Sequence, residues 1–558
     1  MRSPLRTALV ASVTSFSLIL GACSGGASDE EKYNADSIAA ADLNEKPRDE
    51  IQDGGTLTTA IAEISEQQNV FHADSTRYSS DVSRYYMPTL ALFDGEGNYT
   101  PNPDYLTNAS EETKDGNTVV TFDIVDKATF NDGTPIDVKA FETTWKINNG
   151  TNPAYSPAAT DGYERITSVE QGDSPKQVKV TFDGAYAFWQ GLFNQVAHPA
   201  MADPANYNDF INKVHPEWGA GPFKVEYFDP QKGEVKFVRN EKWWGDPAKL
   251  DARVMRQMED SASINAFRNG EINATGVANK NRYATVKNMK GIDIRVAART
   301  SKSLLTLNAK ADNLSDPKVR QAIMTGINRD QIGQIIFNGI PYSETPPGSL
   351  TNYPFQKSYE DNFSTAVEKF DPEAAKKLLD EAGWTQAEGA QFREKDGKPL
   401  TLRYVLMGDS ETSRAMAMAI QAMMKDLGVD LQVQERPSSD FSKVVTTYDF
   451  DVFPMGFNSG DPYGVAYFGQ MYRSGSQLNR SQTGNAEFDA KIDELQDLPT
   501  ADEQIKRGNE LEKEAFKFYG LAPLYNGADM VAVKEDLANY GPGGFAVLPT
   551  EDIGYVKK

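Results

Sequence analysis

A single cysteine, Cys23, limits the ways in which this 558-residue chain can be held together. One thiol excludes every intramolecular disulfide bond and every metal cluster that needs several cysteines. Aromatic residues make up 10% of the chain, which is enough to build large hydrophobic cores. Because a chain of this length exceeds what one core usually serves, we expect two or more lobes.

The residues before Cys23 have the pattern of an export signal. Arg2 and Arg6 give a positive start, and residues 7–20 are apolar or small and carry no charge. This stretch is shorter than the roughly 20 apolar residues of a membrane-spanning helix, which favours a signal peptide over residues 1–22. It ends in Leu20-Gly21-Ala22-Cys23, which resembles the bacterial lipobox. The resemblance implies that Cys23 is lipidated at the outer face of the cytoplasmic membrane. A transmembrane anchor or a buried cysteine is the alternative.

The run that follows Cys23 is small, polar and mostly acidic, without a period that could bury one face. We therefore predict that residues 23–53 form a flexible tether between the lipid anchor and a globular body. Several acyl chains on one cysteine would anchor the protein stably, because a single chain binds a membrane only marginally.

The net charge of −23 argues against two classes of partner. An acidic chain repels nucleic acid and anionic lipid headgroups. Loss of Arg2 and Arg6 with the signal peptide would make the charge −25. A need for solubility is sufficient to explain such a charge. The alternative, functional explanation is a mild preference for neutral or cationic ligands.

The sequence lacks the common signatures of enzymes and metal sites. His72, His198 and His215 form neither HExxH nor an i, i+4 pair, and there is no EF-hand loop, phosphate-binding loop or GxSxG elbow. We therefore predict a protein without catalytic residues, bound metal or cofactor. A paired-carboxylate hydrolase stays an alternative, but among 80 acidic residues a pair is expected by chance.

The order of the expected elements indicates an α/β protein. Alternating residues predict strands over 117–125 and 177–182, and a hairpin of residues 222–228 with 233–239. Helices are expected after the capping residues Asp137, Asp316 and Asp371. A strand at 401–406, a helix at 411–427 and a strand at 428–434 imply a parallel sheet. The methionines of that helix are expected to pack in a core.

Six segments, in order, resemble the family 5 extracellular solute-binding proteins of ABC importers, which include the oligopeptide- and dipeptide-binding proteins. They lie at residues 122–138 (FDIVDKATFNDGTPIDV), 219–245 (GAGPF to WWG), 266–272 (AFRNGEI), 307–328, 370–384 (FDPEAAKKLLDEAGW) and 523–525 (PLY). Each segment also has a structural explanation, since its glycines permit positive φ in turns and its Asp-Pro pairs begin helices. We therefore assign these segments to the scaffold and not to binding.

The resemblance implies a two-lobed, periplasmic-binding-protein-like α/β fold (type II, cluster C) with an extra subdomain in the first lobe. Residues 54–75, 212–302 and 523–558 would form the core of lobe I, residues 76–211 the extra subdomain, and residues 303–522 lobe II. The ligand would be enclosed between the lobes by hinge closure.

The resemblance also indicates a ligand-binding strand. In peptide-binding members, an extended peptide pairs with backbone strands of both lobes, and one strand lies just before an acid that neutralises the peptide's α-ammonium group. The matching stretch here, residues 451–462, contributes Gly456, Phe457, Asn458 and Asp461 as ligand-binding candidates. Asn458 stands where the acid would be, and it supplies no charge. Either Asp461 provides the charge or the ligand lacks a free α-amino group; turn formation before Pro462 is the structural alternative for Asp461.

Four further candidates would face this strand. Ser65 and Glu66 occupy the place of a ligand-lining loop after the first strand, and Tyr155 and Tyr163 lie in a stretch that resembles one with a cleft-facing tyrosine. A tyrosine there could cover an apolar side chain while its hydroxyl forms a hydrogen bond. Core packing is the alternative for each tyrosine.

The resemblance leaves three functions open. The first is a monomeric receptor that passes a small solute, expected to be an oligopeptide, to the membrane permease of an ABC importer. The second is the same scaffold with another solute, such as a glycan or a metal chelate, which Asn458 motivates. The third is a lipoprotein of envelope assembly, which a blocked cleft would favour.

Overall fold

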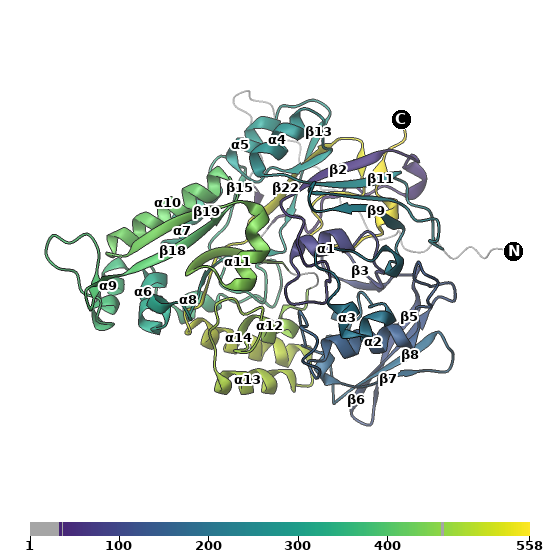
Figure 1. Ribbon diagram of the computed structural model, residues 1–558, viewed down its shortest axis with the longest axis horizontal. Helices are drawn as coiled ribbons and strands as arrows, with labels where there is room; N and C mark the ends of the chain where they lie inside the picture. Colours follow the sequence, from purple (N-terminus) through teal and green to yellow (C-terminus); the bar gives the residue numbers. More distant parts are fainter. Residues whose placement is uncertain (1–32, 36, 459–461) are drawn as a thin grey trace, which may run out of the picture.

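The computed structural model describes residues 33–35, 37–458 and 462–558 (Figure 1). The predicted signal peptide, Cys23 and Asp461 lie outside the described residues. No described helix is both long enough and apolar enough to span a membrane.

Two large sheets organise the two lobes. The sheet of lobe I runs, in spatial order, β13 (Ile292–Ala298), β22 (Ala528–Lys534), β12 (Ala274–Gly276), β2 (Thr56–Ile61), β11 (Ala252–Gln257), β10 (Glu234–Arg239) and β9 (Phe223–Asp229). The sheet of lobe II runs β19 (Asp430–Arg436), β18 (Thr401–Met407), β20 (Val452–Asn458), β14 (Ser301–Leu307) and β21 (Leu521–Tyr525). Figure 1 shows these sheets side by side, with strands β18 and β19 and helix α10 of lobe II in green.

A third sheet builds the extra subdomain of lobe I. Its order is β5 (Leu106–Lys114), β6 (Asn117–Ile124), β8 (Gln177–Phe182) and β7 (Ile166–Gln171), with α2 (Val138–Asn148) and α3 (Pro204–Tyr207) nearby. This unit occupies the lower right of Figure 1. Two-stranded pairs complete the sheets: β1 (Tyr33–Asn34) with β15 (Tyr342–Ser343), β3 (Ala91–Phe93) with β4 (Tyr99–Pro101), β16 (Glu394–Lys395) with β17 (Lys398–Pro399), and β23 (Leu537–Ala538) with β24 (Gly554–Tyr555).

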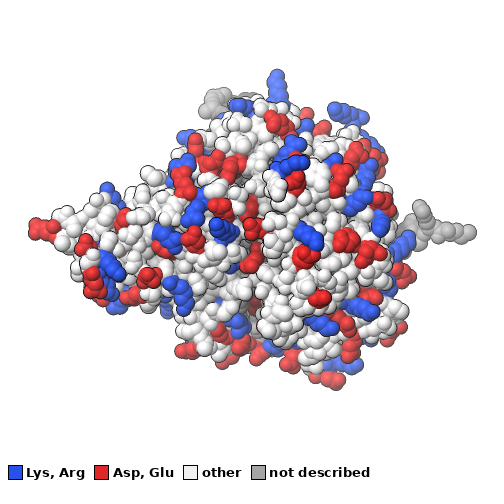
Figure 2. Space-filling view, viewed as in Figure 1, with Lys and Arg blue, Asp and Glu red and all other residues white. Residues whose placement is uncertain are grey.

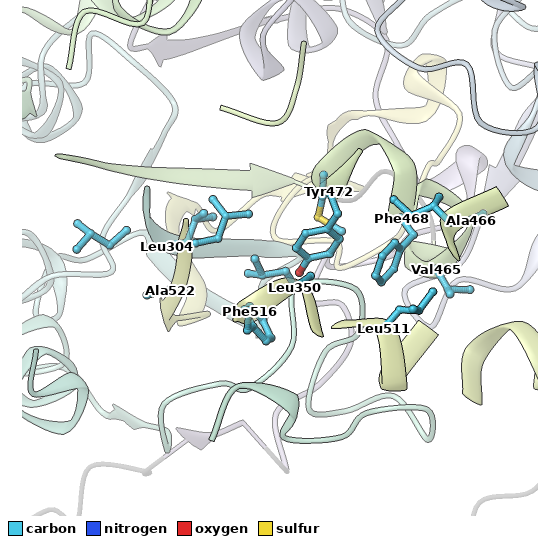
Figure 3. Packing of buried hydrophobic residues seen from close by; sticks show 14 of the residues in the cluster. Leu304, Leu350, Val465, Ala466, Phe468, Tyr472, Leu511, Phe516 and Ala522 are labelled. Atoms are coloured by element: carbon cyan, nitrogen blue, oxygen red, sulfur yellow. The ribbon is translucent and has the colours of Figure 1, made fainter. Parts of the chain in front are cut away.

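Helices cover the sheets. Lobe I carries α1 (Arg77–Ser83), α4 (Asp260–Arg268) and α5 (Lys280–Val286). Lobe II carries α6 (Pro317–Thr325), α7 (Arg329–Ile336), α8 (Asn362–Ala366), α9 (Pro372–Glu381), α10 (Glu411–Asp426), α11 (Phe441–Thr447), α12 (Phe468–Tyr472), α13 (Ala486–Gln496) and α14 (Ala501–Phe516). Figure 3 shows part of the lobe II core, in which Leu304 of β14 lies among side chains of α12, α14 and β21.

Several local predictions are confirmed at atomic detail. The Asp371 carboxylate accepts hydrogen bonds from the N–H groups of Glu373 and Ala374, both at 3.0 Å, and so caps α9. Asp137 and Asp316 cap α2 and α6 in the same way. β9 and β10 form the expected antiparallel hairpin. β18 and β19, which α10 connects in the sequence, pair in parallel as expected.

The predicted tether is wrong over its described part, because residues 37–53 pack on lobe I. Ile51 is fully buried, and the Asp42 carboxylate accepts a 2.9 Å hydrogen bond from the N–H of Val296 in β13. The N–H of Gln52 donates to the carbonyl of Tyr555 at 2.8 Å. The partners are far away in the sequence, and an acidic, unpatterned composition gives no sign of them.

The chain crosses between the two large sheets at residues 299–300 and 526–527. The Glu344 carboxylate accepts hydrogen bonds from the backbone N–H groups of Asn526, at 2.6 Å, and Gly527, at 2.9 Å. Burial raises the pKa of Glu344, and these two donors and the hydroxyl of Tyr342 oppose that rise. One side chain of lobe II therefore fixes the backbone of the second crossing.

Candidate functional site

The strand β20 has one open edge. On one side all seven residues, Val452 to Asn458, pair with β14 in antiparallel register, from Leu307 to Ser301. On the other side β18 pairs with it only at Val452, opposite Tyr404. Among the residues that the structure describes, positions 453–458 therefore have no strand partner on that edge. An open edge of this kind can bind an extended chain through backbone hydrogen bonds.

Three of the predicted ligand-binding residues lie at the end of this edge. Gly456 and Asn458 are exposed, and Phe457 is half-buried against the large core of lobe II. A side chain at position 456 would bring its Cβ within 3.2 Å of Ser301 Oγ in β14, a tight contact that glycine avoids. Asn458 lies opposite Ser301 in the register.

Ser65 lies inside the loop after β2. It is fully buried, and its hydroxyl lies 2.9 Å from Glu63 Oε2 and 2.6 Å from Thr76 Oγ1. Glu66 is exposed, and its backbone carbonyl accepts a 2.6 Å hydrogen bond from the N–H of Asn212. In this conformation Ser65 is therefore an internal support, whereas the Glu66 side chain is open to solvent.

Glu63, which the sequence did not single out, joins the two lobes. Its carboxylate accepts hydrogen bonds from the backbone N–H (3.2 Å) and the hydroxyl (3.1 Å) of Ser442, at the start of α11 in lobe II. Burial raises the pKa of Glu63, and the donors from Ser442 and Ser65 oppose that rise. A carboxylate at the first turn of a helix also interacts favourably with the helix dipole.

A second carboxylate of lobe I binds the adjoining turn. Glu259 accepts hydrogen bonds from the N–H (2.9 Å) and the hydroxyl (2.7 Å) of Ser438, three residues before α11 begins. A third bond between the lobes runs from the Arg480 guanidinium group of lobe II to the backbone carbonyl of Ala73 in lobe I, at 3.2 Å. Because these bonds connect the lobes directly, the described conformation is closed. Figure 2 shows Asp and Glu side chains along the line near the centre of this face where its two halves meet.

The two predicted tyrosines form their hydroxyl hydrogen bonds inside the extra subdomain. Tyr155 is buried in a small core with Tyr207, and its hydroxyl donates to the carbonyl of Ala202 at 2.6 Å. The Tyr163 hydroxyl accepts a 3.1 Å hydrogen bond from the N–H of Phe193, and its ring packs on Phe193 edge to face. Both hydroxyls are thus satisfied inside the extra subdomain, and the structure places both tyrosines in packing positions.

The three histidines lie in structural settings. His198 is stacked on Trp218 and lies 3.1 Å from Asp132, while His215 lies 2.9 Å from a carboxylate oxygen of Glu217. Burial lowers the pKa of His72 and of His198. Within the described part of the chain, no group of three or more His, Cys, Asp and Glu side chains could hold a metal ion. What the described geometry offers at β20 is an open strand edge with backbone groups for hydrogen bonding.

Comparison with known proteins identifies the family of this scaffold. The model of the bacterial extracellular solute-binding proteins, family 5, matches residues 100–479. The oligopeptide-binding protein OppA of Mycobacterium tuberculosis is 31% identical over 560 residues, which cover 97% of this chain and 92% of that protein. The nickel-binding periplasmic protein of Escherichia coli is 25% identical over 65% of this chain and 68% of its own length.

Solved structures agree on the fold. A periplasmic EDTA-binding protein, EppA, has a TM-score of 0.78 and 25% identity, covering 93% of this chain and 99% of that protein. The oligopeptide-binding protein AppA of Bacillus subtilis, solved with a nonapeptide, has a TM-score of 0.79 at 19% identity, covering 91% of this chain and 100% of that one. These likenesses extend over both lobes and the extra subdomain.

Proposed function

The chain belongs to the family 5 bacterial extracellular solute-binding proteins, and from that premise we propose that it is a lipid-anchored receptor that captures oligopeptides and delivers them to an ABC importer. Cys23 would carry the anchor at the outer face of the cytoplasmic membrane. A monomer would close its two lobes around the ligand and present it to the membrane permease.

The open edge of β20 is the observation that supports the peptide as ligand. An extended peptide has unpaired N–H and C=O groups along both sides, and the open edge at positions 453–458 can pair with them, except that Pro454 has no N–H to donate. Gly456 avoids a tight contact with β14, and Phe457 offers an apolar surface to a ligand side chain. The relative that is 31% identical over nearly the whole chain is named for oligopeptide binding.

Peptide binding can be tested with the chain from residue 24 onward, which keeps every described residue. Saturable binding of a pentapeptide library, seen as a rise in melting temperature, is the expected result. Absence of any shift with libraries of two to nine residues would rule out the peptide. Replacing Gly456 by proline removes a backbone donor from the edge and should weaken binding, while Gly475→Pro, in a turn outside the strand, serves as the control.

A chelate or other non-peptide solute is the second candidate. Asn458 motivates it, because the strand lacks an acid at that position for a peptide ammonium group. The periplasmic EDTA-binding protein with 25% identity provides a further reason to test it. Mass spectrometry of the ligand that co-purifies from the native host distinguishes the two: a chelate or a glycan would replace the peptide in this proposal.

A further inference from the structure

The N-terminal segment makes contact with both lobes. Its first described residues, Tyr33 and Asn34, form β1 and pair in parallel with Tyr342 and Ser343 of β15, the short strand that follows α7 of lobe II. The N–H of Tyr33 donates a 2.7 Å hydrogen bond to the carbonyl of Pro341. The residues that come next pack on lobe I. The segment therefore reaches from one lobe to the other.

On lobe I the segment holds the end of β13. The carbonyl of Ala39 accepts a 2.8 Å hydrogen bond from the N–H of Ala298, which is the last residue of that strand. The Asp42 carboxylate accepts a second bond, of 2.9 Å, from the N–H of Val296. The chain leaves lobe I directly after Ala298, at residues 299–300. These contacts therefore fix the backbone where the first crossing begins.

At the second crossing the segment acts through β15. Tyr342 and Ser343 pair with β1, and Glu344 is the next residue. The Glu344 carboxylate accepts the hydrogen bonds from the N–H groups of Asn526 and Gly527 that fix this crossing. It also accepts a 2.7 Å bond from the hydroxyl of Tyr342. Only β15 therefore stands between β1 and the backbone of the second crossing.

Tyr342 also joins the two lobes by packing. Its side chain is buried in a core cluster of lobe I that includes Met530 of β22. On its other side the ring packs edge to face on Phe337, which follows α7 of lobe II, with 5.0 Å between the ring centroids. Tyr33 and Ile38 of the N-terminal segment pack against the same cluster. Figure 1 shows β15 beside β22, where the lobes meet.

We propose that β1 and residues 37–41 form a strap over both crossings, which stabilises the closed conformation and favours opening when it is released. One part of the strap is bound to β15 and the other to β13, so it fits the arrangement of these two strands in the closed form. Movement of one lobe relative to the other would break one of the two contacts. This device goes beyond ligand capture, because it controls the equilibrium between the open and closed forms.

The strap can be released without unfolding either lobe. Its strand β1 has only two residues, and the paired residues Asn34 and Ser343 are both exposed. Short, exposed pairs of this kind open at a much lower free energy than a core does. A lipid anchor at Cys23 would lie ten positions before Tyr33. A force on that anchor would therefore act on β1 before it acts on any other described element.

Truncation tests the strap in the ligand-free protein, so the result does not depend on what the receptor captures. The chain from residue 37 onward lacks β1 but keeps the contacts of Ala39 and Asp42. The chains from residue 24 and from residue 31 onward keep β1 and serve as controls. We expect small-angle X-ray scattering to show a larger open fraction for the shortest chain than for either control.

Hydrogen exchange measures the same effect at the second crossing. In the chain from residue 37 onward, the amides of Asn526 and Gly527 should exchange about threefold or more faster than in the controls, because the loss of a backbone hydrogen bond changes an equilibrium by a factor of that size. Equal scattering profiles and equal exchange rates for the three chains would overturn the proposal.

A reversible crosslink makes the opposite change and keeps the full strap. Asn34→Cys with Ser343→Cys places two thiols on paired, exposed residues, and the chain from residue 24 onward has no other cysteine. Neighbouring strands lie about 5 Å apart, which a disulfide bond can span. We expect the oxidised protein to have a smaller open fraction than the same protein after reduction. Asn34→Cys alone, which cannot form this bond, is the matched control. An oxidised form that is no more closed than the reduced form would contradict the strap.

Peptide affinity separates this proposal from the proposed function. The chain from residue 37 onward should bind the pentapeptide library about threefold or more weakly than the chain from residue 31 onward, since a larger open fraction lowers the affinity of a receptor that closes on its ligand. If neither chain bound peptides, the peptide would be the wrong ligand, and scattering and exchange would still decide on the strap.

Discussion

The side-chain amide of Gln496, at the end of α13 in lobe II, donates a 2.5 Å hydrogen bond to the carboxylate of Asp161 in the extra subdomain of lobe I. Burial raises the pKa of Asp161 to about 7, the charge of Glu164 adds to the rise, and Arg473 and the Gln496 amide oppose it. The Asp161 carboxyl group, which forms one contact between the lobes, is therefore protonated below neutral pH and charged above it.

This shift predicts a pH-dependent stability. The folded state binds the Asp161 proton up to about pH 7, whereas the unfolded chain releases it near pH 4, so the stability that this group contributes falls as the pH rises between those values. The free energy of unfolding of Asp161→Asn, relative to that of wild type, should therefore rise by on the order of 2 kcal/mol when the pH is raised from 5 to 8. Urea unfolding at both pH values measures the difference. Asp173→Asn, at an exposed position, should show none, and a gain of equal size at both pH values would contradict the prediction.

Loss of the Ser442 hydroxyl should favour opening of the lobes. Ser442→Ala removes one hydrogen bond to the buried Glu63 carboxylate, and a bond to a charged group is worth about 1.5–3 kcal/mol. We expect a larger open fraction by small-angle X-ray scattering and a peptide affinity lower by about tenfold or more. Thr447→Ala, an exposed change on the same helix, should leave both unchanged. Equal scattering profiles for the two variants would show that Glu63 does not hold the closed form.

The packed N-terminal segment should contribute directly to folding stability. Ile51 is fully buried, and truncation of such a side chain to alanine costs about 2–5 kcal/mol. Ile51→Ala should lower the free energy of unfolding by that amount in urea titrations, and Glu45→Ala, at an exposed position of the same segment, should have little effect. If Ile51→Ala were as stable as wild type, the prediction would be wrong, and the flexible tether expected from the composition would be the better description.

A charge at position 458 should strengthen peptide binding. Asn458 is exposed at the end of the open strand edge, and a carboxylate there could accept a charge-assisted hydrogen bond from a peptide ammonium group. Because such bonds are roughly twice as strong as neutral ones, Asn458→Asp should raise the affinity for peptides with a free N-terminus by about fivefold. N-acetylated peptides should show no gain in calorimetry. A gain for both peptide classes would place the ammonium group elsewhere.

The sequence predicted best the features that neighbouring residues decide. Asp371 caps α9 because its own carboxylate reaches the N–H groups two and three residues later. The β18, α10 and β19 unit follows from a helical period set between two short apolar strands. The family resemblance then located β20, although it could not show that one edge of this strand is open.

The missed features depend on residues that are distant in the sequence. Glu63 and Ser442 are 379 positions apart, and neither differs from any other glutamate or serine until the fold brings them together. Lys302 stands in a strand of mixed polar and apolar residues, SKSLLTL, and only its packing against Tyr353 reveals its burial. Tyr155 was placed toward the ligand by resemblance, but a tyrosine serves equally in a core when a carbonyl accepts its hydroxyl proton.

The docking of residues 37–53 shortens the distance that can separate the folded receptor from a lipid anchor at Cys23. Only ten positions separate Cys23 from Tyr33, where the described structure begins, and ten residues extend over at most roughly 35 Å. A free segment of 30 residues would have reached nearly three times as far. A receptor lipidated at Cys23 would therefore stay close to the membrane surface. This confinement raises its effective concentration at a permease in the same membrane.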